Sequence, residues 1–171
     1  MNKTRRNILI SGVILVLLAG ATLILARLNR PAAMTEGGTL RVIVDGAVLR
    51  EFTMQELSAL PPVEAEKALS DGDGSPSESV YRGPALRTIL EEAGADLSGA
   101  SQVSVRSDDG YVTVFEIAEI LESDSILLAY SRDGAGLGDR DSGGTGPYQV
   151  IAAQDEFGTR CAKYVCELEA E

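Results

Sequence analysis

The chain of 171 residues contains no histidine and no tryptophan, and it has only two cysteines. The absence of histidine removes the commonest general base, the commonest zinc ligand and every Ser-His or Cys-His catalytic pair. The sequence also contains no G-x-S-x-G, S-x-x-K or Walker A motif, which would indicate a nucleophile or a phosphate-binding loop. We therefore predict no catalytic residue and no metal ligand from sequence motifs.

Acidic residues are absent from the first 30 positions and abundant after them. All 26 aspartates and glutamates follow position 30, together with 10 of the 15 basic residues, so this part of the chain carries a formal charge of −16. Nucleic acid and anionic membrane surfaces are poor partners for such an acidic domain. Calcium, a cationic ligand and a basic protein face are compatible with it.

An uncharged apolar run extends over residues 8–26. At a rise of about 1.5 Å per residue it spans roughly the 30 Å of a bilayer's hydrocarbon core, and we interpret it as a transmembrane signal anchor. The basic residues that precede it favour a cytoplasmic amino terminus. A cleaved signal peptide is the alternative, because small residues at 19–21 and 31–33 could form a cleavage site, and the mature chain would then be secreted.

The anchor predicts a single-pass protein of the cell membrane with its carboxyl-terminal domain on the extracytoplasmic side. The expected divisions are a cytoplasmic basic amino terminus at 1–7, the anchor at 8–26, a linker at 27–38 and an extracytoplasmic domain at 39–171. About 140 residues follow the anchor, which suits one domain with its own core.

Apolar periodicity and turn signals predict an α+β domain, mostly β with mixed sheets and about three short helices. Asp45-Gly46 between two β-rich runs indicates a hairpin, and Thr53 with Glu56 forms a capping box before a helix. We expect helices at 54–59, from Pro84 to Gly94 and at 116–121. Further strands are expected at 102–106, 111–115, 126–130, 148–153 and 159–168, with loops at 70–79 and 132–146.

The two cysteines, Cys161 and Cys166, both lie in the last predicted strand. Five residues of strand would separate their sulfurs by roughly 16 Å, which is beyond the reach of a disulfide. We therefore expect Cys166 to be a small core residue and Cys161 to be a half-exposed thiol that serves packing. An intermolecular disulfide or a reactive thiol at Cys161 is the alternative.

Two acidic, glycine-rich segments, 71–74 and 138–144, could supply oxygen ligands to calcium. Neither follows the twelve-residue EF-hand pattern, so we interpret them as solvated loops. The glycine-rich stretch 134–147 has backbone amides that could hold an anion. It lacks both the P-loop and the dinucleotide-binding motif, and we expect an adaptable surface loop.

Five segments occur in an order that is typical of one family of domains. They are FTMQELSALP, YRGPALRTILEEAG, VSVRSDDGYVTVFEIAEI, ILLAYSRDGAGL and GGTGPYQVIAAQDEFGTRCAKYVCELE. On these segments, from about Thr39 to Glu169, the chain resembles the oxidoreductase molybdopterin-binding domain, which has the sulfite oxidase fold. The resemblance implies that fold and, in active members of the family, a bound molybdenum cofactor.

The sequence departs from this family in the residues that the cofactor requires. The resemblance implies a molybdenum-binding cysteine between the opening helix and the Y-x-G helix, but the interval 61–80 contains none. Cys161 and Cys166 lie in the last predicted strand and do not match that position. Family members also use histidine and arginine to hold the pterin phosphate and the dithiolene, and this chain has no histidine. We therefore predict no cofactor, with molybdopterin as the alternative.

These observations favour a membrane-anchored, extracytoplasmic domain of molybdopterin-oxidoreductase-like fold that is free of cofactor and binds a ligand or a protein partner. A fold can outlast its catalytic residues, because fold and site are separable, and we do not expect an enzyme. The first alternative is a molybdopterin-dependent oxidoreductase with an atypical ligand set. The second is an accessory subunit of an extracytoplasmic redox complex. The sequence names no ligand, partner or oligomeric state.

Large polar or aromatic residues at the ends of predicted elements, beside the loops 70–79 and 132–146, form the candidate ligand face. They are Tyr81, Arg82, Arg106, Tyr111, Arg132 and Tyr148. The alternative for Tyr111 and Tyr148 is a packed ring with a hydrogen-bonded hydroxyl. The alternative for the arginines is an ion pair with one of the many surface carboxylates.

Overall fold

The computed structural model describes residues 15, 18, 20, 38–70 and 76–171. All the described strands lie in one compact unit, Ala32–Glu171. No helix among the described residues is long and apolar enough to cross a membrane. Three predicted segments lie outside the described residues, apart from four single positions. They are the amino terminus at 1–7, the anchor at 8–26 and the linker at 27–38.

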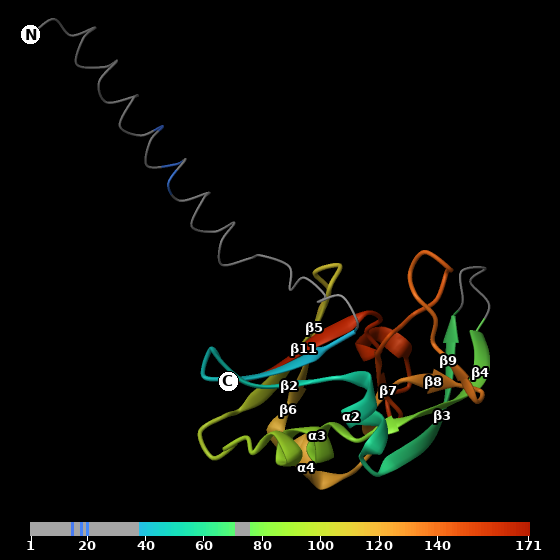
Figure 1. The fold of residues 1–171 in the computed structure, drawn as a ribbon, viewed down its shortest axis with the longest axis horizontal. Helices are drawn as coiled ribbons and strands as arrows, with labels where there is room; N and C mark the ends of the chain where they lie inside the picture. The colour runs from blue at the N-terminus through green and yellow to red at the C-terminus, as the bar shows by residue number, and fades with distance from the viewer. Residues whose placement is uncertain (1–14, 16–17, 19, 21–37, 71–75) are drawn as a thin grey trace, which may run out of the picture. The chain divides into compact units, whose positions relative to one another are not determined.

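A five-stranded mixed sheet has the strand order β2-β1-β11-β5-β6. Its central strand comes from the end of the chain, because β11 lies parallel to β1 and antiparallel to β5. Figure 1 shows the blue β1 beside the red β11. The strands are β1 (Leu40–Val44), β2 (Ala47–Phe52), β5 (Gln102–Ser107), β6 (Val112–Glu116) and β11 (Val165–Ala170).

Local signals in the sequence specify the first hairpin and the first described helix. Asp45 (φ 51°) and Gly46 (φ 75°) both have left-handed backbone, as a two-residue hairpin turn requires. The amide of Glu56 donates to the Thr53 hydroxyl at 3.3 Å, and the Glu56 carboxylate accepts from the Thr53 amide at 2.8 Å. The predicted hairpin and the capping box of α2 (Met54–Ala59) are therefore confirmed.

Two smaller sheets complete the domain, a pair β10-β7 and a four-stranded sheet β3-β4-β8-β9. The strands are β3 (Pro62–Ser70), β4 (Pro76–Pro84), β7 (Ile126–Ala129), β8 (Ser131–Arg132), β9 (Ala135–Gly136) and β10 (Gln149–Ala152). The remaining helices are α3 (Leu86–Ala93), α4 (Ile117–Glu122) and the 3₁₀ turn η1 (Gly158–Arg160). The described residues thus confirm a mostly β domain of mixed sheets with three short α-helices.

Strands β7 and β10 form the layer between two hydrophobic clusters, and each of their residues is buried. Leu128 and Val150 pack into the larger cluster, which includes the apolar faces of α3 and α4. Leu127 and Ile151 point into a smaller cluster around Tyr81. A strand that is covered on both faces has no polar side to expose, which explains the continuous apolar run at 126–129.

The hairpin β3–β4 occupies much of the region where we expected a loop at 70–79. Residues 76–79 belong to β4, and β3 has no counterpart among the predicted strands. Lys67 takes an inward position in β3, where it is only 6 % exposed, and its Nζ donates to the main-chain oxygen of Asp155. A buried lysine interrupts the apolar alternation of β3, so hydropathy alone does not reveal the strand.

Helix α3 begins later than predicted. Pro84 belongs to the end of β4, and the extended Ala85 forms a β-bridge with Leu127 before the helix starts at Leu86. The predicted end is confirmed, because Gly94 has the left-handed backbone (φ 72°) of a helix cap.

The strand expected at 159–168 is shorter and lies further along the chain. It begins only at Val165, because η1 and the left-handed Tyr164 (φ 57°) interrupt the extended backbone. Cys161 therefore lies outside the strand and Cys166 within it. Neither cysteine forms a disulfide, Cys166 is buried and Cys161 is partly buried, as predicted.

We predict that Gly83→Ala destabilises the domain by about 2–3 kcal/mol, which is typical of overpacking. A Cβ at Gly83 would overlap the main-chain carbonyl of Leu128, because β4 crosses β7 at close range there. Urea denaturation followed by circular dichroism measures the change. Gly99→Ala is the matched control, since a Cβ there meets no atom within 4 Å. Equal stability of the two variants would contradict the close approach of β4 and β7.

Candidate functional site

A cleft of about 570 Å³ lies between the β3–β4 hairpin, β10 and the segment 156–163. Leu69 and Pro76 line it from the hairpin, and Phe157 lines it from the opposite segment. Phe157 is 67 % exposed, which is unusual for a large aromatic side chain. Ligand sites in proteins are concave, mostly apolar and of this size, so we treat this cleft as the candidate site.

Gln149 is among the residues that line the cleft. It is the first residue of β10 and is 1 % exposed. Its Oε1 is buried and accepts no hydrogen bond from the residues that the structure describes. A buried polar atom without a partner costs about 1–3 kcal/mol, so Gln149 Oε1 is a local source of instability where β10 meets the cleft.

Cys161 is the only thiol in the lining of the cleft. It follows η1 and packs against both hydrophobic clusters. Burial raises the pKa of the Cys161 thiol and outweighs the hydrogen bond with the Ala152 backbone, which lowers it. Burial also raises the pKa of Cys166, to about 11. Both side chains therefore favour the neutral thiol over the reactive thiolate.

A second hollow of about 480 Å³ adjoins the cleft and is lined by Arg132, Lys163 and the glycine-rich loop. Lys163 lines both spaces. It is exposed and forms no ion pair with any residue in the described part of the chain. Lys163 therefore offers a positive charge at the junction of the cleft and the hollow.

The glycine-rich loop does not present its amides to the hollow. The amide of Gly144 donates to the Asp139 carbonyl at 2.7 Å, and that of Gly146 donates to the Gly138 carbonyl at 2.9 Å. The amides of Gly143 and Thr145 also donate within the loop. These four amides already have acceptors within the loop. The anion-binding role that the sequence allowed for the amides of 134–147 is therefore wrong for residues 143–146.

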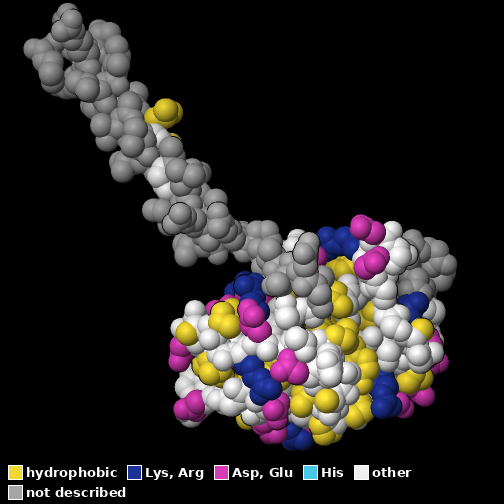
Figure 2. Space-filling model, viewed as in Figure 1, with side chains coloured by type: hydrophobic (Ala, Val, Ile, Leu, Met, Phe, Trp, Pro, Cys, Tyr) yellow, Lys and Arg dark blue, Asp and Glu magenta, His cyan; other side chains and the backbone are white. Residues whose placement is uncertain are grey.

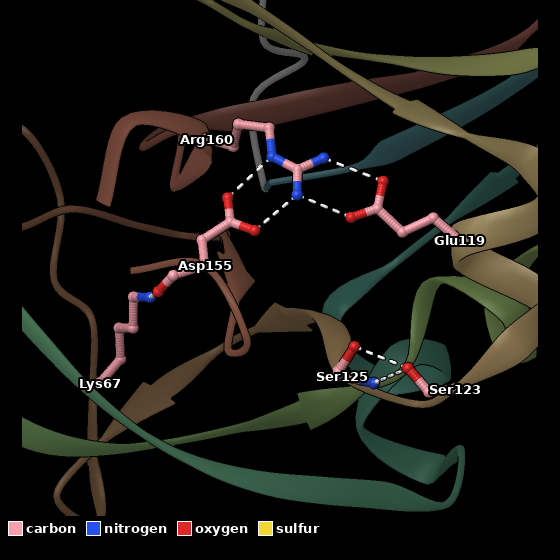
Figure 3. Close-up of polar contacts among 6 residues, drawn as sticks. All are labelled: Lys67, Glu119, Ser123, Ser125, Asp155 and Arg160. Carbon is pink, nitrogen blue, oxygen red and sulfur yellow. Dashed lines mark hydrogen bonds and ion pairs between the residues drawn. The ribbon is translucent and has the colours of Figure 1, made fainter. Parts of the chain in front are cut away.

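A network of charges fixes the segment that carries Cys161 and Phe157. Figure 3 shows the Arg160 guanidinium between the carboxylates of Asp155 and Glu119. Its Nε donates to Asp155 Oδ2 at 2.7 Å, and its Nη1 and Nη2 donate to the two oxygens of Glu119 at 2.9 and 2.6 Å. Arg160 also lies over the ring of Phe115, 4.7 Å from its centre.

This network joins β3 and α4 to the segment 155–160. Lys67 contributes from β3, where its Nζ binds the Asp155 carbonyl, and Glu119 contributes from α4. The hydrogen bond from Arg160 lowers the pKa of Asp155, and the two carboxylates raise the pKa of Arg160. The charges of the network are thus satisfied by one another, so we assign it a positioning role.

The structure separates the six residues of the candidate ligand face. Tyr81 and Arg132 are neighbours across β4 and β8. Tyr81 is buried in the smaller cluster, whereas Arg132 lines the second hollow. Arg82, on the same strand as Tyr81, pairs with Glu64 at 2.7 Å.

The other three residues lie elsewhere. Arg106 pairs with Glu169 at 2.8 Å, and Tyr111 is 49 % exposed with its hydroxyl donating to the Thr159 carbonyl at 2.6 Å. Tyr148 is fully buried and donates to the Gly38 carbonyl at 2.6 Å. The alternative prediction, a packed ring with a hydrogen-bonded hydroxyl, is confirmed for Tyr148. For Tyr111 the hydroxyl is hydrogen-bonded as predicted, but the ring is exposed.

Ion pairs account for most of the described arginines. Figure 2 shows basic and acidic side chains next to one another over the visible face. Among these pairs, Arg87 contacts Asp124 at 2.8 Å and Arg140 contacts Asp108 at 2.5 Å. The alternative prediction for the arginines, an ion pair with a surface carboxylate, is confirmed for Arg82 and Arg106. Ligand binding by any of the six residues stays a prediction.

Sequence reasoning missed Gln149, Phe157 and Lys163 as lining residues. One signal for Gln149 was present, since it is the only strongly polar side chain in the apolar run YQVIAA. Lys163 and Phe157 carry no comparable signal, because their position over the cleft depends on the fold of the segment 156–163.

Comparison with known proteins supports the family resemblance. The sequence model described as oxidoreductase molybdopterin binding domain matches residues 29–171. No curated protein matches the chain. The crystal structure of the sulfane dehydrogenase SoxCD from Paracoccus pantotrophus is similar in fold, with a TM-score of 0.62 and 16% sequence identity. The match covers 81% of this chain and 39% of that one, so the present chain spans about two fifths of its length.

We predict that Asp155→Asn lowers the stability of the domain at pH 7 by about 1–3 kcal/mol, because it weakens charged hydrogen bonds to Arg160. The Asp155 pKa is lower in the folded state than in the unfolded state. Its contribution is therefore present above about pH 4 and is lost as the pH falls through the folded-state value.

Urea denaturation between pH 2.5 and 7 tests this prediction. The stability difference between wild type and Asp155→Asn should be largest at neutral pH and should shrink in acid. Asp141→Asn, in the exposed loop, is the control and should follow the wild-type curve. A difference that is independent of pH would show that the Asp155 charge contributes nothing.

Proposed function

Because this chain belongs to the oxidoreductase molybdopterin-binding domain family, we propose that it keeps the family's fold as a binding domain and takes up a ligand in its cleft without molybdenum. The observation that carries this proposal is the lining of the cleft. It combines an exposed aromatic ring at Phe157 with the apolar side chains of Leu69 and Pro76 and one ammonium group at Lys163.

The residues of the cleft do not fit a molybdenum cofactor. The one thiol of the cleft lining, Cys161, follows η1 and lies outside the interval 61–80, where the family resemblance implies the molybdenum-binding cysteine. The phosphate of such a cofactor requires cationic side chains, and Lys163 is the only one among the described residues that line the cleft. We therefore derive no chemical step through molybdenum.

The proposed domain functions outside the cytoplasm, tethered to the cell membrane by a single span at 8–26. The uncharged run and the basic residues before it support this location. The formal charge of −16 beyond position 30 also supports it, since an acidic domain is not attracted to anionic lipid headgroups. In this proposal the span ends near 26, a linker extends over 27–38 and the binding domain begins at 39.

A molybdopterin-dependent oxidoreductase with an atypical ligand set is the second candidate function. One observation favours it, namely that Cys161 lines the cleft and is not fully buried. A bound metal could shift the thiol toward the thiolate, because coordination deprotonates a thiol. In that case Cys161 would be the metal ligand.

We predict that the full chain, purified in mild detergent from a host that makes the molybdenum cofactor, contains neither stoichiometric molybdenum nor pterin. Elemental analysis measures the metal, and fluorescence of the oxidised pterin measures the organic part. One molybdenum per chain would refute the proposed function and support the second candidate.

The variant Cys161→Ser separates the remaining possibilities. If wild type contains metal and Cys161→Ser does not, Cys161 is the ligand. Cys166→Ser is the matched control, because that thiol is buried in β11 and does not line the cleft. A membrane protein that purifies together with the metal-free chain would instead support an accessory subunit of a larger complex.

A further inference from the structure

We propose that the free edge of β3 binds an extended segment of a partner protein, which adds a further strand to the sheet β3-β4-β8-β9. The segment would carry lysine or arginine at alternate positions and small apolar residues between them. The edge in question is formed by Glu64 and Glu66, which do not line the cleft, so this inference is independent of the cleft's ligand.

Strand β3 is an edge strand without the usual protection against pairing. It pairs with β4 from Pro62 to Ser70, with no shift of register, and no other described strand lies beside it. Bulges, interior prolines and outward lysines protect many natural edge strands, and β3 has none of them. Its one lysine, Lys67, is turned inward, where the Asp155 carbonyl binds it.

The main-chain groups of Glu66 face away from β4. Its register partner on β4 is Val80, whose amide donates to Asp133 Oδ1 at 2.9 Å and whose carbonyl accepts from the Asp133 amide at 2.8 Å. Val80 thus uses its main-chain groups on the side of β8, and antiparallel geometry turns those of Glu66 to the free edge. Glu64, two positions earlier, has the same orientation. No described residue forms a main-chain hydrogen bond with either glutamate at this edge.

The side chains of β3 alternate between an apolar face and an acidic face. Val63 and Ala65 pack against the smaller hydrophobic cluster, yet both are only partly buried. Small apolar side chains on an added strand would lie beside them and remove more of their surface from water. Glu64 and Glu66 are exposed on the opposite face, so the added strand would need polar residues there.

The charge of the edge favours a basic partner over a second copy of this chain. Glu64 pairs with Arg82 of β4 at 2.7 Å, whereas Glu66 forms no ion pair with any residue that the structure describes. Opposite charges on adjacent strands stabilise their pairing, and like charges oppose it. Two β3 strands would bring glutamates against glutamates, between domains that each carry a formal charge of −16 beyond position 30.

Peptides that differ only in methylated amides test the main-chain contacts. The parent probe is fluorescein-labelled Thr-Lys-Val-Lys-Val-Thr, and two isomers carry N-methyl groups on both lysines or on both valines. The isomers have equal charge, but only one set of amides faces β3 in a bound strand. Fluorescence anisotropy with the full chain in mild detergent should show one isomer binding roughly tenfold more weakly than the other, the effect of two lost hydrogen bonds.

Variants of Glu66 separate the main-chain contact from the charge. Glu66→Pro removes the outward N–H without breaking a hydrogen bond to β4, and it should weaken binding of the parent peptide roughly tenfold. Glu66→Gln keeps the amide and loses only the charge, so we expect about a two- to fivefold loss. Glu51→Gln is the control, because this exposed glutamate lies on β2 in the five-stranded sheet, and it should bind as wild type does.

Three results would overturn this inference. The first is absence of binding by the parent peptide, and the second is equal affinity of the two methylated isomers for the wild-type chain. The third is a dimer in light scattering that Glu66→Pro dissociates, since the edge would then bind a second copy. The comparison of isomers needs no variant, so it stands even if Glu66→Pro does not fold. Stoichiometric molybdenum would refute the proposed function and leave this inference in place.

Discussion

The Arg160 guanidinium is the contact on which the arrangement of the cleft depends. It holds Asp155 on one side and Glu119 on the other, and Lys67 fixes the backbone of Asp155 from β3. The segment 156–163 forms no strand, so no interstrand hydrogen bonds of a sheet hold it. The side-chain contacts of Arg160 and Lys67 fix its position instead. They place Phe157 and Cys161 over the β3–β4 hairpin. The ions satisfy one another, so they stabilise a surface without supplying a reactive group.

A second constraint comes from the layer β7–β10, which is buried on both faces. Its side chains alternate between the two hydrophobic clusters, and β4 crosses it so closely that only glycine fits at position 83. Gln149 begins β10 at the margin of this layer, where the packed core meets the cleft. Its side chain is therefore held by a buried strand, whereas Phe157 and Lys163 lie on an irregular segment that the Arg160 network holds in place.

Local sequence signals predicted the elements that depend on local interactions. The Asp45-Gly46 turn, the capping box of Thr53 and Glu56 and the Gly94 cap each involve residues at most four positions apart, so their signals are complete in the sequence. Strand β3 was missed because its inward lysine is explained only by Asp155, 88 positions further on. The last strand was placed too early because Arg160 turns toward Glu119 on a different element. The cleft was missed for the same reason, since the β3–β4 hairpin, β10 and the segment 156–163 meet only in the folded chain.

The pairing of β1 with β11 also has a consequence for how such a chain is made. The middle strand of the five-stranded sheet is the last one to be synthesised, and β1, β2, β5 and β6 cannot form a continuous sheet without it. Until Val165–Ala170 arrives, the two hairpins remain separate and the larger core is open to water. The five-stranded sheet therefore closes only after this late segment pairs with both hairpins, so its formation depends on contacts between residues more than 100 positions apart.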